Sequence, residues 1–366
     1  MTHTLACVMP APDKPVELRE VPIPELELDS ALMRVELSEV CGTDVFLRQG
    51  RLAETPYPLI PGHVSVGTIE AIRGTMCDIN GTALREGDPV TFLDVHETCH
   101  ACWHCLVAKA STRCPHRKVY GITYGLDDGL TGGWARHLYL KPGVRCIRTD
   151  SLDASTFMSG GCSLPTSLHA TDLARITPGD TVLVLGSGPV GLSSIIFALM
   201  NGALRVLCVG APDARLDIAR TVGAHDVCNF QQHDEEGRLR WVLDRTEGRG
   251  ADITIEATGA PSAVVDAMRF TRDAGRVVVV GQYTDHGTID FNPHLDLNKK
   301  HLEILGCWGS DFSHFYRGVQ ILSDPARAAM WAPIELERFS LARANEALDL
   351  VQQGAITKAL IEPHLE

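Results

Sequence analysis

Four cysteines of this chain crowd one short stretch. Cys99, Cys102, Cys105 and Cys114 follow the pattern C-x2-C-x2-C-x8-C within 16 residues, whereas the other eight of the twelve cysteines are scattered. A secreted disulfide framework would spread its pairs along the chain, and a tight cluster in an intracellular protein is typical of a metal site. Four thiolates leave no open coordination position, so we predict a structural zinc lobe over about 96–116. His100 and His104 lie between these cysteines and could serve as alternative ligands, but we expect them to flank the site.

A second set of metal ligands is dispersed. Cys41 and His63 are 22 residues apart, each at a turn, and Cys162 follows two glycines. Two thiolates and one imidazole can hold a zinc ion and leave a fourth position for a substrate oxygen. Single Cys and His residues are more often part of a core, so spacing alone leaves this triple open.

A glycine-rich turn indicates a dinucleotide site. It follows the apolar segment 181–185 and opens an apolar helix that extends through Met200. Its glycines serve the tight turn, the close approach of a pyrophosphate and helix–strand packing, and the helix N-terminus offers free N–H groups to phosphates. Proline at the first helical position needs no N–H donor. The expected coenzyme-binding residues of this turn are Gly186, Ser187, Gly188, Pro189, Val190 and Gly191.

The elements that must position these residues change in character along the chain. The first 160 residues read as short strands separated by turn signals, with strands expected at 32–37, 65–72 and 89–95. From about Thr171 strands alternate with helices, which indicates an α/β fold with a parallel, doubly wound sheet. The expected elements there are strands at 181–185, 205–209, 252–257 and 276–281, and helices at 213–222 and 262–271. The charged run 233–249 is interpreted as a solvated helix face with its exit loop.

Composition excludes several classes of function. The 366 residues carry 33 Lys and Arg against 46 Asp and Glu, a net charge of −13, which argues against general nucleic-acid binding. The apolar stretch 181–200 is interrupted by glycine, proline and serine, so we do not expect it to span a membrane. The N-terminus lacks the pattern of a signal peptide, and we expect a cytoplasmic protein.

Motifs along nearly the whole chain resemble the zinc-containing medium-chain dehydrogenase/reductase family, the relatives of alcohol, sorbitol and threonine dehydrogenases. The segment Gly161-Cys-Ser-Leu-Pro-Thr, with the insert before Gly87, is similar to the hydroxycamphor type of bacterial cyclic-alcohol dehydrogenase. The matching stretches are Cys41-Gly-Thr-Asp, Pro61-Gly-His63, Gly87-Asp88, the four-cysteine lobe, Gly132-Gly-Trp-Ala, Gly160-Gly-Cys162, the glycine-rich turn, Arg215-Leu, Gly223-Ala, Glu256-Ala-Thr-Gly259, Gly275-Arg and Gly281.

The resemblance implies a GroES-like, mainly-β catalytic domain of residues 1–163 and 306–366, with a Rossmann coenzyme domain of 164–305. It implies a catalytic zinc held by Cys41, His63 and Cys162 and a structural zinc held by the lobe. Asp44 would orient His63, and Thr43 would pass the substrate's hydroxyl proton. Further coenzyme contacts are implied for Thr258, Gly281 and Lys358, the last with the pyrophosphate. Family members are homodimers or homotetramers.

The second strand of the coenzyme domain indicates a preference for NADP over NAD. NAD-specific folds end this strand with an acidic residue that binds the ribose 2′-OH. Here that position is Gly210, and Arg215, one helical turn onward, can meet a 2′-phosphate. Pro212 stands where NADP-using relatives often have arginine, and Asp213 is an alternative ribose partner.

Three departures from the family pattern concern the catalytic centre and the lobe. The family's Gly-His-Glu is Gly62-His63-Val64 here, so a carboxylate near the catalytic zinc is missing. Phe46 replaces the histidine of the usual proton relay, and His96 is an unplaced substitute. The lobe has eight residues before its last cysteine, where seven are usual.

These observations predict a zinc-dependent alcohol dehydrogenase or ketone reductase that transfers a hydride between a secondary or cyclic alcohol and NAD(P). A formaldehyde- or thiol-adduct-type dehydrogenase of the same family is the alternative within this class. A non-catalytic nucleotide sensor or a zinc-finger binding protein is the alternative outside it. We expect two zinc ions per chain, a small-molecule substrate, and neither nucleic acid nor membrane as a partner.

Overall fold

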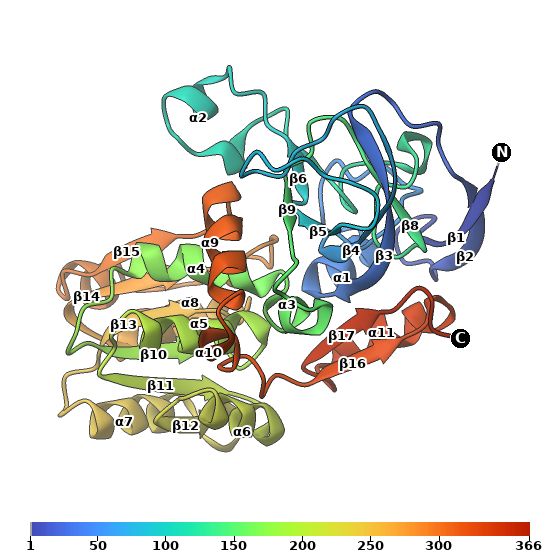
Figure 1. Ribbon diagram of the computed structural model, residues 1–366. Helices are drawn as coiled ribbons and strands as arrows, with labels where there is room; N and C mark the ends of the chain where they lie inside the picture. The colour runs from blue at the N-terminus through green and yellow to red at the C-terminus, as the bar shows by residue number, and fades with distance from the viewer. Residues whose placement is uncertain (1) are drawn as a thin grey trace. The chain divides into compact units, whose positions relative to one another are not determined.

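The computed structural model describes residues 2–366, which form two compact units (Figure 1). Unit 1 comprises residues up to Cys162 together with Asp311–Pro325 and Glu335–Glu366. Unit 2 comprises Ser163–Ser310 and Ala326–Ile334. The short segment Ala326–Ile334 therefore packs with unit 2, although we expected it to follow the rest of the C-terminal residues.

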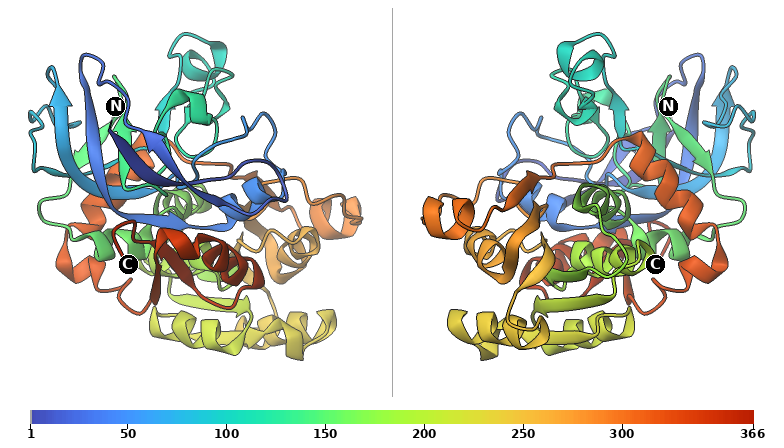
Figure 2. Two further views of the ribbon diagram at one scale, coloured as in Figure 1. Left: turned by 90° about the vertical axis from the view of Figure 1, so that its right-hand side faces the viewer. Right: turned by 90° about the vertical axis from the view of Figure 1, so that its left-hand side faces the viewer.

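Unit 1 is built on a curved, seven-stranded sheet (Figure 2). The order is β16-β17-β3-β4-β5-β9, and β8 also pairs with β3. The single strand expected at 89–95 is divided into β5 (Pro89–Phe92) and β6 (Val95–Glu97). The sheet strands are β3 (Ser30–Val40), β4 (Ser65–Arg73), β5 (Pro89–Phe92), β8 (His137–Leu140), β9 (Cys146–Arg148), β16 (Leu336–Phe339) and β17 (Lys358–Ile361).

Apolar side chains of β3, β4 and β5 form the core of unit 1. Met33, Val35, Ile69, Val90 and Phe92 are buried together in one cluster. Burying such side chains contributes roughly 1.5–3 kcal/mol each. The other elements of unit 1 are β1 (His3–Val8), β2 (Glu17–Pro22), α1 (Gly42–Arg48), β6 (Val95–Glu97), α2 (Trp103–Leu106), β7 (Lys118–Val119), α3 (Ala154–Gly160), α9 (Phe312–Leu322) and α11 (Ala344–Gln353).

Unit 2 is the predicted parallel sheet, with helices lying against it (Figure 2). The strand order is β12-β11-β10-β13-β14-β15, so the chain reverses direction across the sheet between β10 and β13. Ligands of such sheets bind at the carboxyl ends of the strands near this point. The strands are β10 (Thr181–Leu185), β11 (Arg205–Gly210), β12 (Asp226–Asn229), β13 (Ala251–Glu256), β14 (Thr271–Val279) and β15 (Glu303–Gly306).

The helices of unit 2 match the apolar patterns of the sequence. The charged run contains α7, which is capped by the Asp234 carboxylate and carries acidic residues in its first turn. No helix within residues 2–366 combines the length and the apolar character needed to cross a bilayer. The helices are α4 (Ser163–Ala174), α5 (Pro189–Met200), α6 (Asp213–Thr221), α7 (Glu235–Arg245) and α8 (Pro261–Phe270), and the short α10 (Pro325–Ala328) begins at the last residue of a unit 1 segment.

Candidate metal centres and coenzyme site

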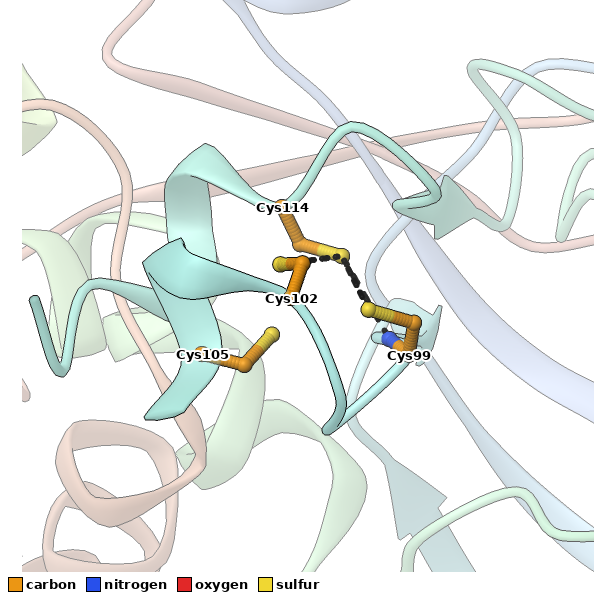
Figure 3. A group of neighbouring side chains, drawn as sticks. All are labelled: Cys99, Cys102, Cys105 and Cys114. Carbon is orange, nitrogen blue, oxygen red and sulfur yellow. Dashed lines mark hydrogen bonds between the residues drawn. The ribbon is translucent and has the colours of Figure 1, made fainter. Parts of the chain in front are cut away.

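The four lobe cysteines turn their side chains toward one centre (Figure 3). Their sulfur atoms all lie within 4.8 Å of one another, and Cys114 Sγ is 3.6 Å from Cys99 Sγ. The short helix α2 supplies Cys102 as its N-cap and Cys105 within it. The pairing of β6 with β7 closes the lobe at its base. Among the described residues this cluster contains cysteines only, so neither His100 nor His104 belongs to it.

The donor set of the lobe fits zinc. The backbone N–H of Ala101, followed by neighbouring thiols, lowers the pKa of Cys99 to about 6, which favours the thiolate. Burial, with hydrogen bonds to Cys102 and Cys114, raises the pKa of Cys105 to about 12. Four cysteine sulfurs around one centre suit a closed tetrahedral zinc site, in which metal binding would release the remaining thiol protons.

The dispersed triple also comes together, in unit 1. Cys41 is the N-cap of α1 directly after β3, His63 precedes β4, and Cys162 follows α3. The ligand atoms lie within 4.8 Å of one another: the sulfur atoms of Cys41 and Cys162 and a ring nitrogen of His63. Cys41 Sγ is 3.8 Å from His63 Nε2. The fold thus brings Cys41 and Cys162, which are more than 100 positions apart, together with His63 in one ligand set.

The three side chains of this triple shift one another's pKa values. The Cys162 thiol donates to the Cys41 sulfur, which lowers the pKa of Cys41 and raises the pKa of Cys162. Burial acts to lower the pKa of His63, but the charge and hydrogen bond of Cys41 outweigh it and raise that pKa to about 10. A thiolate beside an imidazole in a buried pocket suits a divalent cation, which replaces the shared protons.

Asp44 and Thr43 lie on the first turn of α1, beside Cys41. Asp44 is fully buried, and its Oδ2 accepts the Cys41 N–H at 2.9 Å, which closes a capping box. Asp44 Oδ1 and His63 Nδ1 are both buried and have no hydrogen-bond partner among the described residues. The Thr43 N–H donates to Cys41 Sγ at 3.4 Å.

A carboxylate that the sequence analysis missed lies next to the triple. Glu39 is 1% exposed, and its Oε2 accepts the Cys162 N–H at 2.6 Å. A buried carboxylate from β3 therefore lies beside the triple, whereas Val64 supplies none. The sequence signal was weak, because β3 also contains the exposed charged residues Arg34 and Glu36.

The partner of Glu39 is Lys358, for which the resemblance implied a pyrophosphate contact. Lys358 is 2% exposed, and its Nζ lies 3.0 Å from Glu39 Oε1. The same ammonium donates to the carbonyls of Met158 and Gly160. These buried partners account for Lys358 within unit 1, and the pyrophosphate contact stays a prediction.

The glycine-rich turn of unit 2 has the geometry of a phosphate cradle. Gly186 has φ +110°, and a Cβ there would lie 2.8 Å from the Ala257 carbonyl oxygen. A Cβ at Gly191 would lie 1.9 Å from the Gly186 oxygen, so helix and strand pack closely. At Gly188, the N-cap of α5, a Cβ would meet no described atom within 4 Å, which leaves room for a ligand. Pro189 and Val190 open α5.

Three further predicted coenzyme residues lie at the same carboxyl edge of the sheet. Gly210 ends β11, Thr258 follows β13 and Gly281 follows β14. Glu256, fully buried, accepts from the backbone and hydroxyl of Thr258, both at 2.6 Å, and organises this edge. Ser187 is buried and donates to the Ala211 carbonyl at 3.1 Å.

The residues that we expect to decide between NAD and NADP lie at the start of α6. Asp213 accepts from the Asn229 amide at 2.8 Å and from the Gln232 amide at 3.3 Å, so its carboxylate faces these side chains. Arg215 is half-buried, and burial lowers its pKa. A Cβ at Gly210 would lie 2.5 Å from Ser187 Oγ and 3.1 Å from Ser187 N.

His96 is held at both ring nitrogens. Nε2 lies 2.9 Å from the Pro142 carbonyl oxygen and therefore donates, which leaves Nδ1 to accept the Tyr124 hydroxyl at 2.5 Å. Burial lowers the pKa of His96 and keeps the ring neutral. Because both ring nitrogens of His96 are already hydrogen-bonded, His96 is poorly suited to act as a proton relay.

Comparisons with known proteins give matches along most of the chain. The model of the alcohol dehydrogenase GroES-like domain matches residues 27–150, and the model of zinc-binding dehydrogenases matches residues 189–324. The chain is 32% identical to 5-exo-hydroxycamphor dehydrogenase of Pseudomonas putida, with all of both chains covered. It is 30% identical to the erythritol/L-threitol dehydrogenase of Mycolicibacterium smegmatis over 92% of this chain and 91% of the relative. A crystal structure of an alcohol dehydrogenase from Thermotoga maritima superposes with a TM-score of 0.93 at 30% identity and full coverage of both chains.

The chain belongs to the zinc-binding alcohol dehydrogenase family. It is an oxidoreductase that acts on small-molecule alcohols with zinc and NAD(P). The predicted fold class, a GroES-like mainly-β domain with a Rossmann coenzyme domain, is confirmed.

Proposed function

We propose that this protein reversibly oxidises a secondary or cyclic alcohol to a ketone, with one catalytic and one structural zinc per chain and a preference for NADP. The observation that carries the proposal is the convergence of Cys41, His63 and Cys162, a three-ligand set that leaves one zinc position for substrate. The lobe cysteines hold the second zinc. The relatives named for hydroxycamphor and for polyols support a secondary alcohol as substrate.

When bound at the triple, zinc supplies Lewis-acid polarisation of a substrate oxygen. The residues of this chain orient that chemistry. Asp44 stabilises the N-terminus of α1 through the Cys41 N–H, and its carboxyl group lies close enough to interact electrostatically with His63. Thr43, on the same turn, accepts the substrate's hydroxyl proton as its own hydroxyl passes a proton on. Phe46 cannot carry a proton, so the proton leaves through water or the coenzyme ribose.

The coenzyme preference rests on the missing acid at Gly210. A carboxylate there would bind the ribose 2′-OH and repel a 2′-phosphate. The Asp213 carboxylate already accepts hydrogen bonds from Asn229 and Gln232, which argues against its serving the ribose instead. Arg215, on the first turn of α6, is the cation that we expect to meet the phosphate.

The test of this preference uses Arg215→Gln rather than a change at Gly210, where a side chain would collide with Ser187. The matched control is Arg220→Gln, on the same helix but paired with Asp217. We expect wild-type kcat/KM to favour NADP, and Arg215→Gln to reduce that ratio about tenfold while the control leaves it unchanged. Wild-type enzyme that favours NAD by tenfold or more would overturn the preference.

A panel of alcohols and ketones tests the substrate class. We expect turnover of bulky secondary and cyclic alcohols above that of primary short-chain ones, measured by coenzyme absorbance. Turnover of only primary alcohols, or of only thiol adducts of formaldehyde, would contradict the proposal.

We further propose that the protein is cytoplasmic and forms a homodimer or homotetramer, as the family resemblance implies. Light scattering after size-exclusion chromatography tests the oligomeric state.

A further inference from the structure

Glu39 and Lys358 form a buried ion pair whose position requires explanation. Both side chains are almost fully excluded from solvent, and Nζ lies 3.0 Å from Oε1. Burying two charges is costly, and an apolar pair of similar volume often gives equal or greater stability. Stability alone is therefore a weak reason for this pair to stand in the core of unit 1.

The pair holds the chain at the third ligand of the proposed catalytic zinc. Glu39 Oε2 accepts the Cys162 N–H at 2.6 Å. Lys358 Nζ donates to the carbonyls of Met158 at 2.7 Å and Gly160 at 3.0 Å, at the end of α3. The two side chains thus bind the backbone on either side of Gly161.

Gly161 shows how closely the pair approaches this turn. Its φ is +51°, and a Cβ there would lie 2.0 Å from Glu39 Oε2 and 2.5 Å from Lys358 Nζ. Any side chain would displace the pair. The turn that ends α3 and presents Cys162 is therefore shaped around the two charged groups.

The two members of the pair are themselves fixed by the sheet. β17 and β3 are antiparallel neighbours in which Ala359 faces Val40 and Leu360 faces Glu39. The main chain of Glu39 is also bound, since its N–H donates to the Val64 carbonyl and its carbonyl accepts the Trp134 indole N–H. Glu39 Oε is not among the mutually close ligand atoms of the triple, so it acts on a ligand rather than as one.

We propose that Glu39 is a positioning residue of the catalytic centre: its carboxylate oxygen fixes the Cys162 backbone, and Lys358 balances the charge of that carboxylate. This inference rests on the proposed zinc site. Groups that orient metal ligands typically change metal affinity or activity 10- to 100-fold when removed.

The experiment compares two double variants that both remove the buried charges. Glu39→Gln/Lys358→Met keeps an oxygen to accept the Cys162 N–H, and Glu39→Leu/Lys358→Met leaves that N–H without an acceptor. Zinc affinity is measured by chelator competition, with zinc bound to the lobe as the internal control. The absorption bands of cobalt substituted at the catalytic site report the ligand geometry independently of activity.

We expect the Leu variant to lose at least tenfold in zinc affinity at the catalytic site and to shift the cobalt bands. The Gln variant should stay within threefold of wild type with unshifted bands, and both should keep the lobe zinc. If the two variants behave alike, both retaining or both losing affinity, the proposal is wrong. Wild-type protein that binds only one zinc would instead contradict the proposed catalytic site, so the two failures are distinguishable.

Discussion

The hydrogen bonds of His96 limit the role that this single residue can have in proton transfer. Its Nε2 donates to the Pro142 carbonyl and its Nδ1 accepts from Tyr124, so moving a proton through it would break both hydrogen bonds. Its pKa is lowered by burial. Both facts argue that His96 stabilises its surroundings as a neutral ring.

We predict that His96→Gln retains at least a third of wild-type kcat and changes the pH dependence of stability. The lowered pKa means that unfolded chains bind a proton that the folded chain excludes. Stability from neutral His96 is therefore complete above the unfolded pKa of about 6.5 and is lost as the pH falls below it.

The measurement is the melting temperature of wild type and variant between pH 7.5 and pH 5.5. Wild type should lose more stability over this range than His96→Gln. An equal loss in both proteins would contradict the neutral assignment, and a collapse of kcat with both zinc ions bound would identify His96 as a relay after all.

At the scale of elements, we expect the lobe to depend on bound metal more than on packing. Its helix α2 has four residues, and Trp103, Leu106 and Val107 are exposed, so little apolar surface holds it. Structural zinc contributes folding energy directly in such segments.

We expect Cys114→Ser to lower the melting temperature by several degrees and to lose the lobe zinc, while the remaining folded protein keeps its coenzyme affinity. Cys77→Ser is the matched control, because Cys77 is an exposed cysteine outside both clusters. Zinc analysis and calorimetry provide the readouts. An unchanged melting temperature with zinc still in the lobe would refute this role.

The elements themselves were largely predictable, whereas their side-chain contacts were not. The alternation of apolar strands and helices after Thr171 predicted β10, α5, β11 and α6 within a residue or two, because local periodicity determines such elements. Glu39 could not be found in this way. It meets Cys162 across 123 positions, through a fold that no local pattern describes.

At the scale of the whole molecule, sequence and structure differ in how the chain divides between units. A boundary near Cys162 is visible in the sequence as the change from strands to alternating elements. The return of Ala326–Ile334 to unit 2 is not, because it depends on packing. Trp331 is fully buried and donates to Ser193 Oγ of α5 at 3.1 Å, which holds this segment to unit 2.

The central claim is that Cys41, His63 and Cys162 hold the zinc at which the alcohol reacts. The most direct test is the zinc content of wild type and Cys162→Ala, measured by mass spectrometry of the metals together with turnover and coenzyme affinity. The account predicts two zinc ions per chain in wild type. It predicts one in the variant, with no measurable turnover and a coenzyme Kd within threefold of wild type. A variant that keeps two zinc ions and the wild-type rate would contradict the claim and show that another side chain completes the site.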